Sequence, residues 1–174
     1  NNSAFGSYAL RANTTGNNNT AFGAQSLREN ITGSRNTAVG FQSMLSNVNG
    51  TNNTAFGYTA LLNNTTNNNT AIGYQALSTN TIGTNNTALG VNSLLFNTTG
   101  GQNTAVGRST LQNNTIGLTN SAFGSYSLNA NTTGSQNSAF GYKSLVSNTT
   151  GVYNNAFGYR ALQGNTIGTS NNAF

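Results

Sequence analysis

The sequence predicts an all-β protein, a parallel β-solenoid or β-roll in which each coil takes one 17-residue repeat. Three observations support this fold class: a short repeat along all 174 residues, a strand-like segment that opens each repeat, and two glycines at fixed places in it. Self-similarity at a short fixed period is typical of stacked, solenoid-like folds. We therefore expect one solenoid segment over residues 1–174.

The period is set by an alanine that recurs in every repeat. Nine of the ten intervals between its copies are 17 residues, and the interval from Ala55 to Ala71 is 16. The unit reads N-[TSN]-A-[FVIL]-G-x-x-[AST]-[LM]-x-x-N-[TIV]-[TIN]-G-x-x, and the repeat at 55–70 lacks the second glycine. The pattern predicts about ten such repeats, with no charged or irregular cap at either end.

Other repeat architectures fit less well. Leucine-rich repeats need several leucines per unit and helical repeats are longer, whereas this unit has one dependable leucine. Gly, Thr and Asn are also poor helix formers. At about 3.3 Å per strand residue, 17 residues can make a coil of two short strands and two turns. Coils about 4.8 Å apart would make ten coils about 48 Å long.

The opening segment N-T-A-F-G has the alternation of a strand, which places Thr and the apolar residue on one face and Ala on the other. We expect two apolar ladders along the solenoid. The pattern leaves open which ladder faces inward and which faces a neighbour. The first consists of Phe5, Phe22, Val39, Phe56, Ile72, Leu89, Val106, Phe123, Phe140 and Phe157, and the second of Leu10, Leu27, Met44, Leu61, Leu77, Leu94, Leu111, Leu128, Leu145 and Leu162.

A glycine ends each strand segment in every complete repeat, which predicts a positive φ angle or a backbone contact that no Cβ would allow. The second glycine, missing at 55–70 without disturbing the next repeat, is expected in another turn. The strand glycines are Gly6, Gly23, Gly40, Gly57, Gly73, Gly90, Gly107, Gly124, Gly141 and Gly158.

Two asparagines per repeat invite two interpretations. N-x-[ST] sequons suggest glycosylation, with Asn13, Asn52, Asn85, Asn97, Asn131 and Asn148 as candidates. The strand-opening asparagine is never a sequon, however, and the asparagine after Leu persists where the sequon is broken, as at Asn47 and Asn80. Stacked amide ladders explain both rows. The first ladder includes Asn19, Asn36, Asn53, Asn69, Asn86, Asn103, Asn120 and Asn137.

The composition argues against catalysis. General acid–base chemistry needs a His or paired carboxylates, and metal sites need His, Cys or carboxylate ligands. The chain has no His, no Cys and a single acid, Glu29. We expect no enzyme activity, catalytic residue, cofactor or metal. The net charge of +5 rests on six cations that look scattered along the sequence, so we expect no nucleic-acid partner. No apolar run approaches a membrane span.

The tyrosines that follow the strand glycine, Tyr58, Tyr74, Tyr142 and Tyr159, are interpreted as a packing row at the solvent edge. Binding to a carbohydrate or protein is the alternative.

The strand segments NTAFG, NTAIG, NTALG and NTAVG resemble the head repeats of trimeric autotransporter adhesins. They are still more similar to the Asn-Thr-Gly repeats of phage and viral tail-fibre proteins and related bacterial surface proteins. The resemblance covers the whole chain. It implies a left-handed parallel β-roll, three chains around one axis, and apolar strand residues at the trimer centre. This unit is longer than the adhesin-head unit and has Thr where that strand has an apolar residue.

The expected function is therefore a non-enzymatic structural segment of an extracellular fibre or filament at a cell surface or on a virion. Its expected partners are copies of itself, as a homo-oligomer such as a trimer or as an end-to-end filament, and a cell-surface or glycan receptor. An ice-binding or glycan-binding solenoid is the alternative. The Thr row argues against ice binding, because it decays into Ser and Asn and is followed by Phe two residues on.

Overall fold

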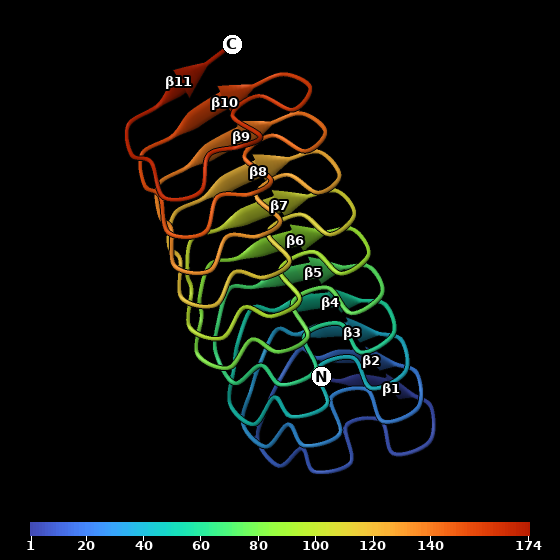
Figure 1. Ribbon diagram of the computed structural model, residues 1–174. Helices are drawn as coiled ribbons and strands as arrows, with labels where there is room; N and C mark the ends of the chain where they lie inside the picture. The colour runs from blue at the N-terminus through green and yellow to red at the C-terminus, as the bar shows by residue number, and fades with distance from the viewer.

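The computed structural model describes all 174 residues as eleven short parallel strands without a helix. Each strand pairs in register with the strand of the next repeat, alanine against alanine, so the sheet order follows the chain from β1 to β11. Figure 1 shows the strands stacked along the solenoid, with the two termini at opposite ends. The predicted β-solenoid with one repeat per coil is confirmed. Each coil takes the number of its strand.

The strands are three residues long, except for the last, which has two. They are β1 (Ser3–Phe5), β2 (Thr20–Phe22), β3 (Thr37–Val39), β4 (Thr54–Phe56), β5 (Thr70–Ile72), β6 (Thr87–Leu89), β7 (Thr104–Val106), β8 (Ser121–Phe123), β9 (Ser138–Phe140), β10 (Asn155–Phe157) and β11 (Asn172–Ala173).

The expectation of two strands per coil is wrong, because each coil contains one strand and otherwise turns and bends. Only 20 of the 114 backbone hydrogen bonds lie within the strands. Most of the others join a turn to the same turn of the next coil. The Leu94 N–H, for example, donates to the Thr110 carbonyl at 3.0 Å. The coils are therefore held together mainly through their turns.

Left-handed backbone conformations explain why no second strand forms. The 30 non-glycine residues with positive φ occupy three positions of the repeat, represented in coil 3 by Gln42, Met44 and Asn52 at φ 53°, 51° and 57°. A strand needs φ near −120°, so each of these positions bends the chain. The strand glycine bends it further. Gly23 has φ +134°, and a Cβ there would lie 2.6 Å from the Gly40 carbonyl oxygen of the next coil.

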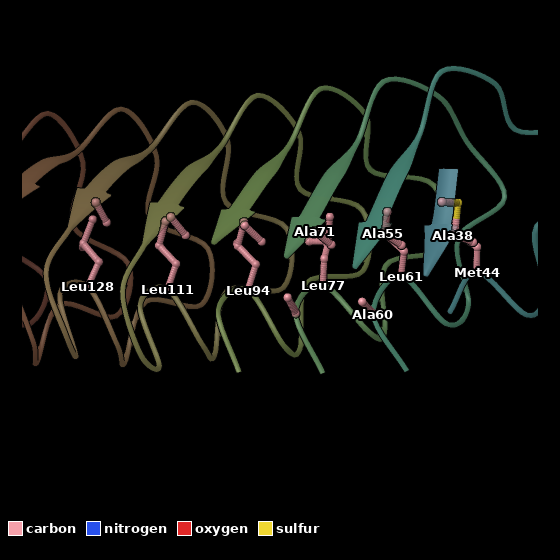
Figure 2. Packing of buried hydrophobic residues seen from close by; sticks show 14 of the residues in the cluster. Ala38, Met44, Ala55, Ala60, Leu61, Ala71, Leu77, Leu94, Leu111 and Leu128 are labelled. Atoms are coloured by element: carbon pink, nitrogen blue, oxygen red, sulfur yellow. The ribbon is translucent and has the colours of Figure 1, made fainter. Parts of the chain in front are cut away.

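The core is a file of leucines that faces a file of alanines. The leucine positions from Leu27 to Leu145, including Met44, are fully buried, and so are the alanines of β3 to β10. Figure 2 shows this file from Met44 to Leu128 inside the coils, with Ala38, Ala55 and Ala71 beside it. Complete burial of one leucine contributes about 1.5–3 kcal/mol. The strand Phe positions face outward, because successive strand residues point to opposite faces. Of the two apolar ladders, the leucines are thus inside and the phenylalanines outside.

Candidate functional surfaces

The asparagine after Leu forms an unbroken amide ladder inside the solenoid. In each coil its Nδ2 donates to the Oδ1 of the asparagine one coil earlier, as from Asn97 to Asn80 and from Asn114 to Asn97, both at 2.8 Å. The same Nδ2 also donates to the carbonyl of the second glycine, three residues later, at 3.1 Å for Asn114 and Gly117. We call this row the turn asparagines: Asn13, Asn30, Asn47, Asn64, Asn80, Asn97, Asn114, Asn131, Asn148 and Asn165.

The strand-opening asparagines form a second ladder with a different partner. The Oδ1 of Asn36 accepts the backbone N–H of Asn53, one coil on, at 3.0 Å. The Asn36 Nδ2 donates to the Gly50 carbonyl at 2.7 Å. Asn47 donates to that same carbonyl at 3.1 Å. The predicted asparagine ladders are confirmed, and the two rows meet at the carbonyl of the second glycine.

The shortened coil keeps this meeting point without its glycine. In coil 4 the Thr66 carbonyl accepts from Asn53 at 2.6 Å and from Asn64 at 2.9 Å. The Thr66 hydroxyl adds a bond to the Gly83 carbonyl of the next coil at 2.8 Å. Thr66 thus supplies the carbonyl that a glycine supplies elsewhere, and the turn is shorter by one residue between Asn64 and that carbonyl.

The candidate glycosylation sites fall into two groups, asparagines of the internal ladder and asparagines on an exposed turn. Asn97, Asn131 and Asn148 are turn asparagines with no exposed surface, and each Nδ2 donates two hydrogen bonds. Asn13 belongs to the same row and is half-buried. Asn52 and Asn85 lie instead on an exposed turn with left-handed backbone, at φ 57° and 59°. Of the six candidates, only these last two are exposed residues.

The outward strand position forms a continuous apolar file, the outer stripe: Phe5, Phe22, Val39, Phe56, Ile72, Leu89, Val106, Phe123, Phe140, Phe157 and Phe174. Its rings stack where phenylalanines are neighbours. The ring centroids of Phe123 and Phe140 are 4.8 Å apart at an interplanar angle of 9°, and those of Phe140 and Phe157 are 4.8 Å apart at 4°. The stripe is exposed, with Phe22 at 53% and Phe56 at 57%.

The tyrosine row also stacks along the solenoid. Phe41, Tyr58 and Tyr74 follow one another with centroids 5.5 and 5.3 Å apart, and Tyr142 stacks on Tyr159 at 5.6 Å. This is the packing arrangement expected for these tyrosines.

Three of the six cations converge on the tyrosines of coils 8 to 10, although they look scattered in the sequence. Arg108 and Lys143 both lie over the Tyr126 ring, at 5.7 and 5.9 Å from its centroid. Lys143 is also 5.3 Å from the Tyr142 ring, and Arg160 is 5.1 Å from the Tyr159 ring. We call these six residues the tyrosine–cation patch. The sequence does not reveal the patch, because its members are spread over residues 108–160 and come together only when four successive coils stack.

The structure has no group of three or more His, Cys, Asp or Glu side chains and no ligand pocket. No helix of membrane-spanning length and hydropathy occurs. The recurring features that could serve a function are the two internal amide ladders and two surfaces, the outer stripe and the tyrosine–cation patch.

Comparison of the chain with protein families, with curated proteins and with solved structures found no match.

Proposed function

We propose that this chain is a non-enzymatic structural segment of an extracellular fibre or filament, in which copies of the solenoid associate side by side through the outer stripe. The observation that carries the proposal is an apolar residue at the outward strand position of every coil, exposed in most coils and half-buried at Val39, Val106 and Phe140. Contiguous apolar surface of this extent is unusual for a soluble monomer and typical of an interaction site.

The size of the stripe supports a stable contact. Six of its seven phenylalanines are between 37% and 94% exposed. At about 200 Å² for a whole phenylalanine side chain, these six leave about 700 Å² accessible. A standard interface buries about 800 Å² on each partner. With Ile72 and Leu89 added, which are 38% and 43% exposed, the stripe approaches that area.

The periodicity of the stripe favours a second copy of this chain as the partner. The apolar residue recurs once per coil, at the spacing of paired strands, about 4.8 Å. A partner that contacts every residue must present groups at the same spacing over the same length. A parallel copy of the solenoid does so, because the same file runs along its own surface. The stripe contains no charged residue, so a like surface can approach it without repulsion.

The internal ladders support a role in length and stiffness. Each coil is joined to the next by backbone bonds around its circumference and by two amide ladders. All the recurring residues identified in the repeat, apart from the outer stripe and its flanking Thr row, are used in these contacts within the chain. A repeat whose fixed residues serve stacking fits a rod better than a receptor with a localised site.

Ice binding is less well supported. The outward polar residue of each strand, Thr, Ser or Asn, lies beside the outward apolar residue two positions on, as Thr54 beside Phe56. The sheet therefore presents one polar file and one apolar file, and not the paired Thr ranks that order surface water.

The experiment compares two triple variants of the chain by sedimentation equilibrium and negative-stain electron microscopy. Phe22→Ser, Phe56→Ser and Phe123→Ser together remove apolar surface from the stripe. Ile31→Ser, Ile82→Ser and Ile116→Ser remove equally exposed apolar groups, 41–61% accessible, from the turns. We expect the unmodified chain to form rods of two or three laterally associated copies, and the stripe variant to associate at least about tenfold more weakly.

The turn variant should associate as the unmodified chain does. A chain that stays monomeric at every concentration, or equal weakening by the two variants, would contradict lateral association through the stripe. Circular dichroism of each variant shows whether the solenoid is intact.

A further inference from the structure

The tyrosine–cation patch concentrates positive charge on one part of the solenoid. It holds Arg108, Lys143 and Arg160, which are half of the cations in the chain. The single acid, Glu29, lies in coil 2, six coils away from Tyr126. The positive charge of the patch is therefore not compensated by any neighbouring carboxylate. An uncompensated field of this kind attracts an anionic partner.

The tyrosine rings position the cations without using their hydrogen-bond donors. A cation over a ring face is held by the negative charge of that face, whereas its N–H groups stay available. The Lys143 ammonium has three donors, and each guanidinium has five. Arg108 and Arg160 are exposed, so these donors face solvent. Side chains that are already ordered lose less conformational entropy when they bind a carboxylate.

The arrangement of the tyrosine rings favours an acidic sugar chain over a nucleic acid as the anionic partner. Tyr142 and Tyr159 are stacked at an interplanar angle of 16°, and Tyr126 meets Tyr142 edge-on at 88°. Each ring thus has a neighbouring ring or a cation close to it, whereas Tyr142 and Tyr159 stay 39% and 70% exposed. Single-stranded nucleic acids bind by stacking successive bases on successive free aromatic faces, whereas Tyr126, Tyr142 and Tyr159 already contact one another. Hydroxyls and cations in a row suit a chain that carries both hydroxyl and carboxylate groups.

We propose that the tyrosine–cation patch binds an acidic polysaccharide of the uronic-acid class, with the sugar chain parallel to the solenoid axis. Carboxylates accept hydrogen bonds from Arg108, Lys143 and Arg160, and the tyrosine hydroxyls bond to sugar hydroxyls. The coil spacing of about 4.8 Å is comparable to the length of one pyranose unit in an extended chain, so successive sugars meet successive coils. This site is separate from the outer stripe, and its function does not depend on lateral association.

The experiment measures binding of the chain to polygalacturonate by isothermal titration calorimetry. Fully methyl-esterified polygalacturonate, the uncharged form of the same polymer, and oligo-deoxythymidine serve as comparison ligands. The test variant is Lys143→Gln with Arg160→Gln. Glutamine occupies the same repeat position at Gln25, Gln42 and Gln75, so the solenoid should tolerate it. The matched control is Arg28→Gln with Arg35→Gln, which removes the same charge from coil 2, where neither arginine lies over a ring.

We expect polygalacturonate to bind and the methyl ester not to bind. The test variant should weaken binding by about tenfold or more, as expected from the loss of two charge-assisted hydrogen bonds, and the control by less than about twofold. Tyr142→Phe, which keeps the ring as in Phe41, should weaken binding to a smaller extent. Absence of binding, equal losses in the test and control variants, or tighter binding of oligo-deoxythymidine would overturn the proposal. Unchanged thermal unfolding of each variant shows that a loss of affinity arises at the patch.

Discussion

At the scale of the residue, buried asparagine carries much of the specificity of this fold. The fully buried side chains of the interior include about twice as many amides as leucines, because each interior coil buries two asparagines and one leucine or methionine. A buried amide without partners destabilises a protein, but one whose groups are all bonded fixes its neighbours in place. Here each turn asparagine joins three successive coils, because it donates to one neighbouring amide and accepts from the other.

Replacement of a turn asparagine should therefore lower the free energy of unfolding substantially. Asn114→Ala removes the bonds to Asn97, to Gly117 and from Asn131, and it leaves buried partners unpaired. We expect a loss of about 3 kcal/mol in the free energy of unfolding, measured by denaturant titration. Asn52→Ala, at an exposed turn, should lower it by only about 1 kcal/mol, because alanine adopts the left-handed backbone of this position less readily than asparagine. Equal effects of the two substitutions would show that the ladder does not stabilise the solenoid.

The same difference in burial predicts where glycans attach. If the chain is produced in a cell with N-glycosylation machinery, folded protein should carry glycans at Asn52 and Asn85 and none at Asn97, Asn131 or Asn148. The reason is that the ladder occupies the acceptor nitrogen, and an attached sugar would prevent the coil from closing. Glycopeptide mass spectrometry of the folded fraction tests this. A glycan at Asn131 in folded protein would contradict the assignment of that row to the interior.

At the scale of the element, the unit of this fold is the turn, and turns stack like strands in a sheet. The turn that follows the strand glycine carries a short ladder of glutamine side chains. In it, Gln42 Nε2 donates to Gln25 Oε1 at 2.8 Å. Gln75 occupies the same position in coil 5, but Thr59 interrupts the row in coil 4. Thr59 is a β-branched residue at φ 49°, and its buried hydroxyl has no hydrogen-bond partner.

Completion of this row should stabilise the chain. Thr59→Gln removes the unpaired hydroxyl and the β-branched side chain from a left-handed position, and it places glutamines in four successive coils. We expect a gain of about 1 kcal/mol in the free energy of unfolding, seen as a higher denaturant midpoint. Lys143→Gln, which creates a glutamine without glutamine neighbours, should give no gain. A destabilised Thr59→Gln variant would mean that the turn of coil 4 cannot accommodate the longer side chain.

The sequence shows the period of the repeat, but it does not show which face of each strand points into the solenoid. The fold class, the coil length and the amide ladders follow from the 17-residue spacing. Alternation places Phe56 and Thr54 on one strand face but does not say which face is inside. That choice depends on the width of the coil, which admits Ala55 opposite Leu61 and excludes a phenylalanine. The missing second strand depends on left-handed residues such as Leu61, at φ 51°, and leucine gives no sign of that conformation. The cation patch depends on stacking across coils.

At the scale of the whole molecule, each coil contacts only its neighbours along the axis, since every strand pairs only with the strands before and after it. The stability of such a chain is close to a sum of coil and interface terms. No contact links distant coils, and every interior coil has nearly the same surroundings. If one coil is removed, the next coil can therefore take its place against the preceding coil.

Removal of one complete coil should therefore leave the solenoid folded. Deletion of residues 86–102 joins Asn85 to Asn103 and keeps the repeat in phase, so we expect native circular dichroism and a loss of about 2 kcal/mol, one coil's share of the stability. Deletion of residues 86–94 removes half a coil, including all of β6, and should leave β5 and β7 unable to pair in register. Limited proteolysis distinguishes the two outcomes, because the first variant should resist cleavage and the second should be cut near residue 95. Equal protease sensitivity would count against coils as independent units.

The 16-residue coil 4 has a consequence for how such a chain can change over generations. Its turn lost a residue, yet Thr66 restored the carbonyl at which the two amide rows meet, and β5 follows in register. A gene that encodes tandem units of 17 codons can gain or lose whole units by unequal recombination. Chains with one repeat more or fewer would still fold, because each new boundary between two coils repeats a contact that already exists in this molecule. The number of repeats in the gene would then set the length of the rod. This length could change during evolution without any new contact between coils.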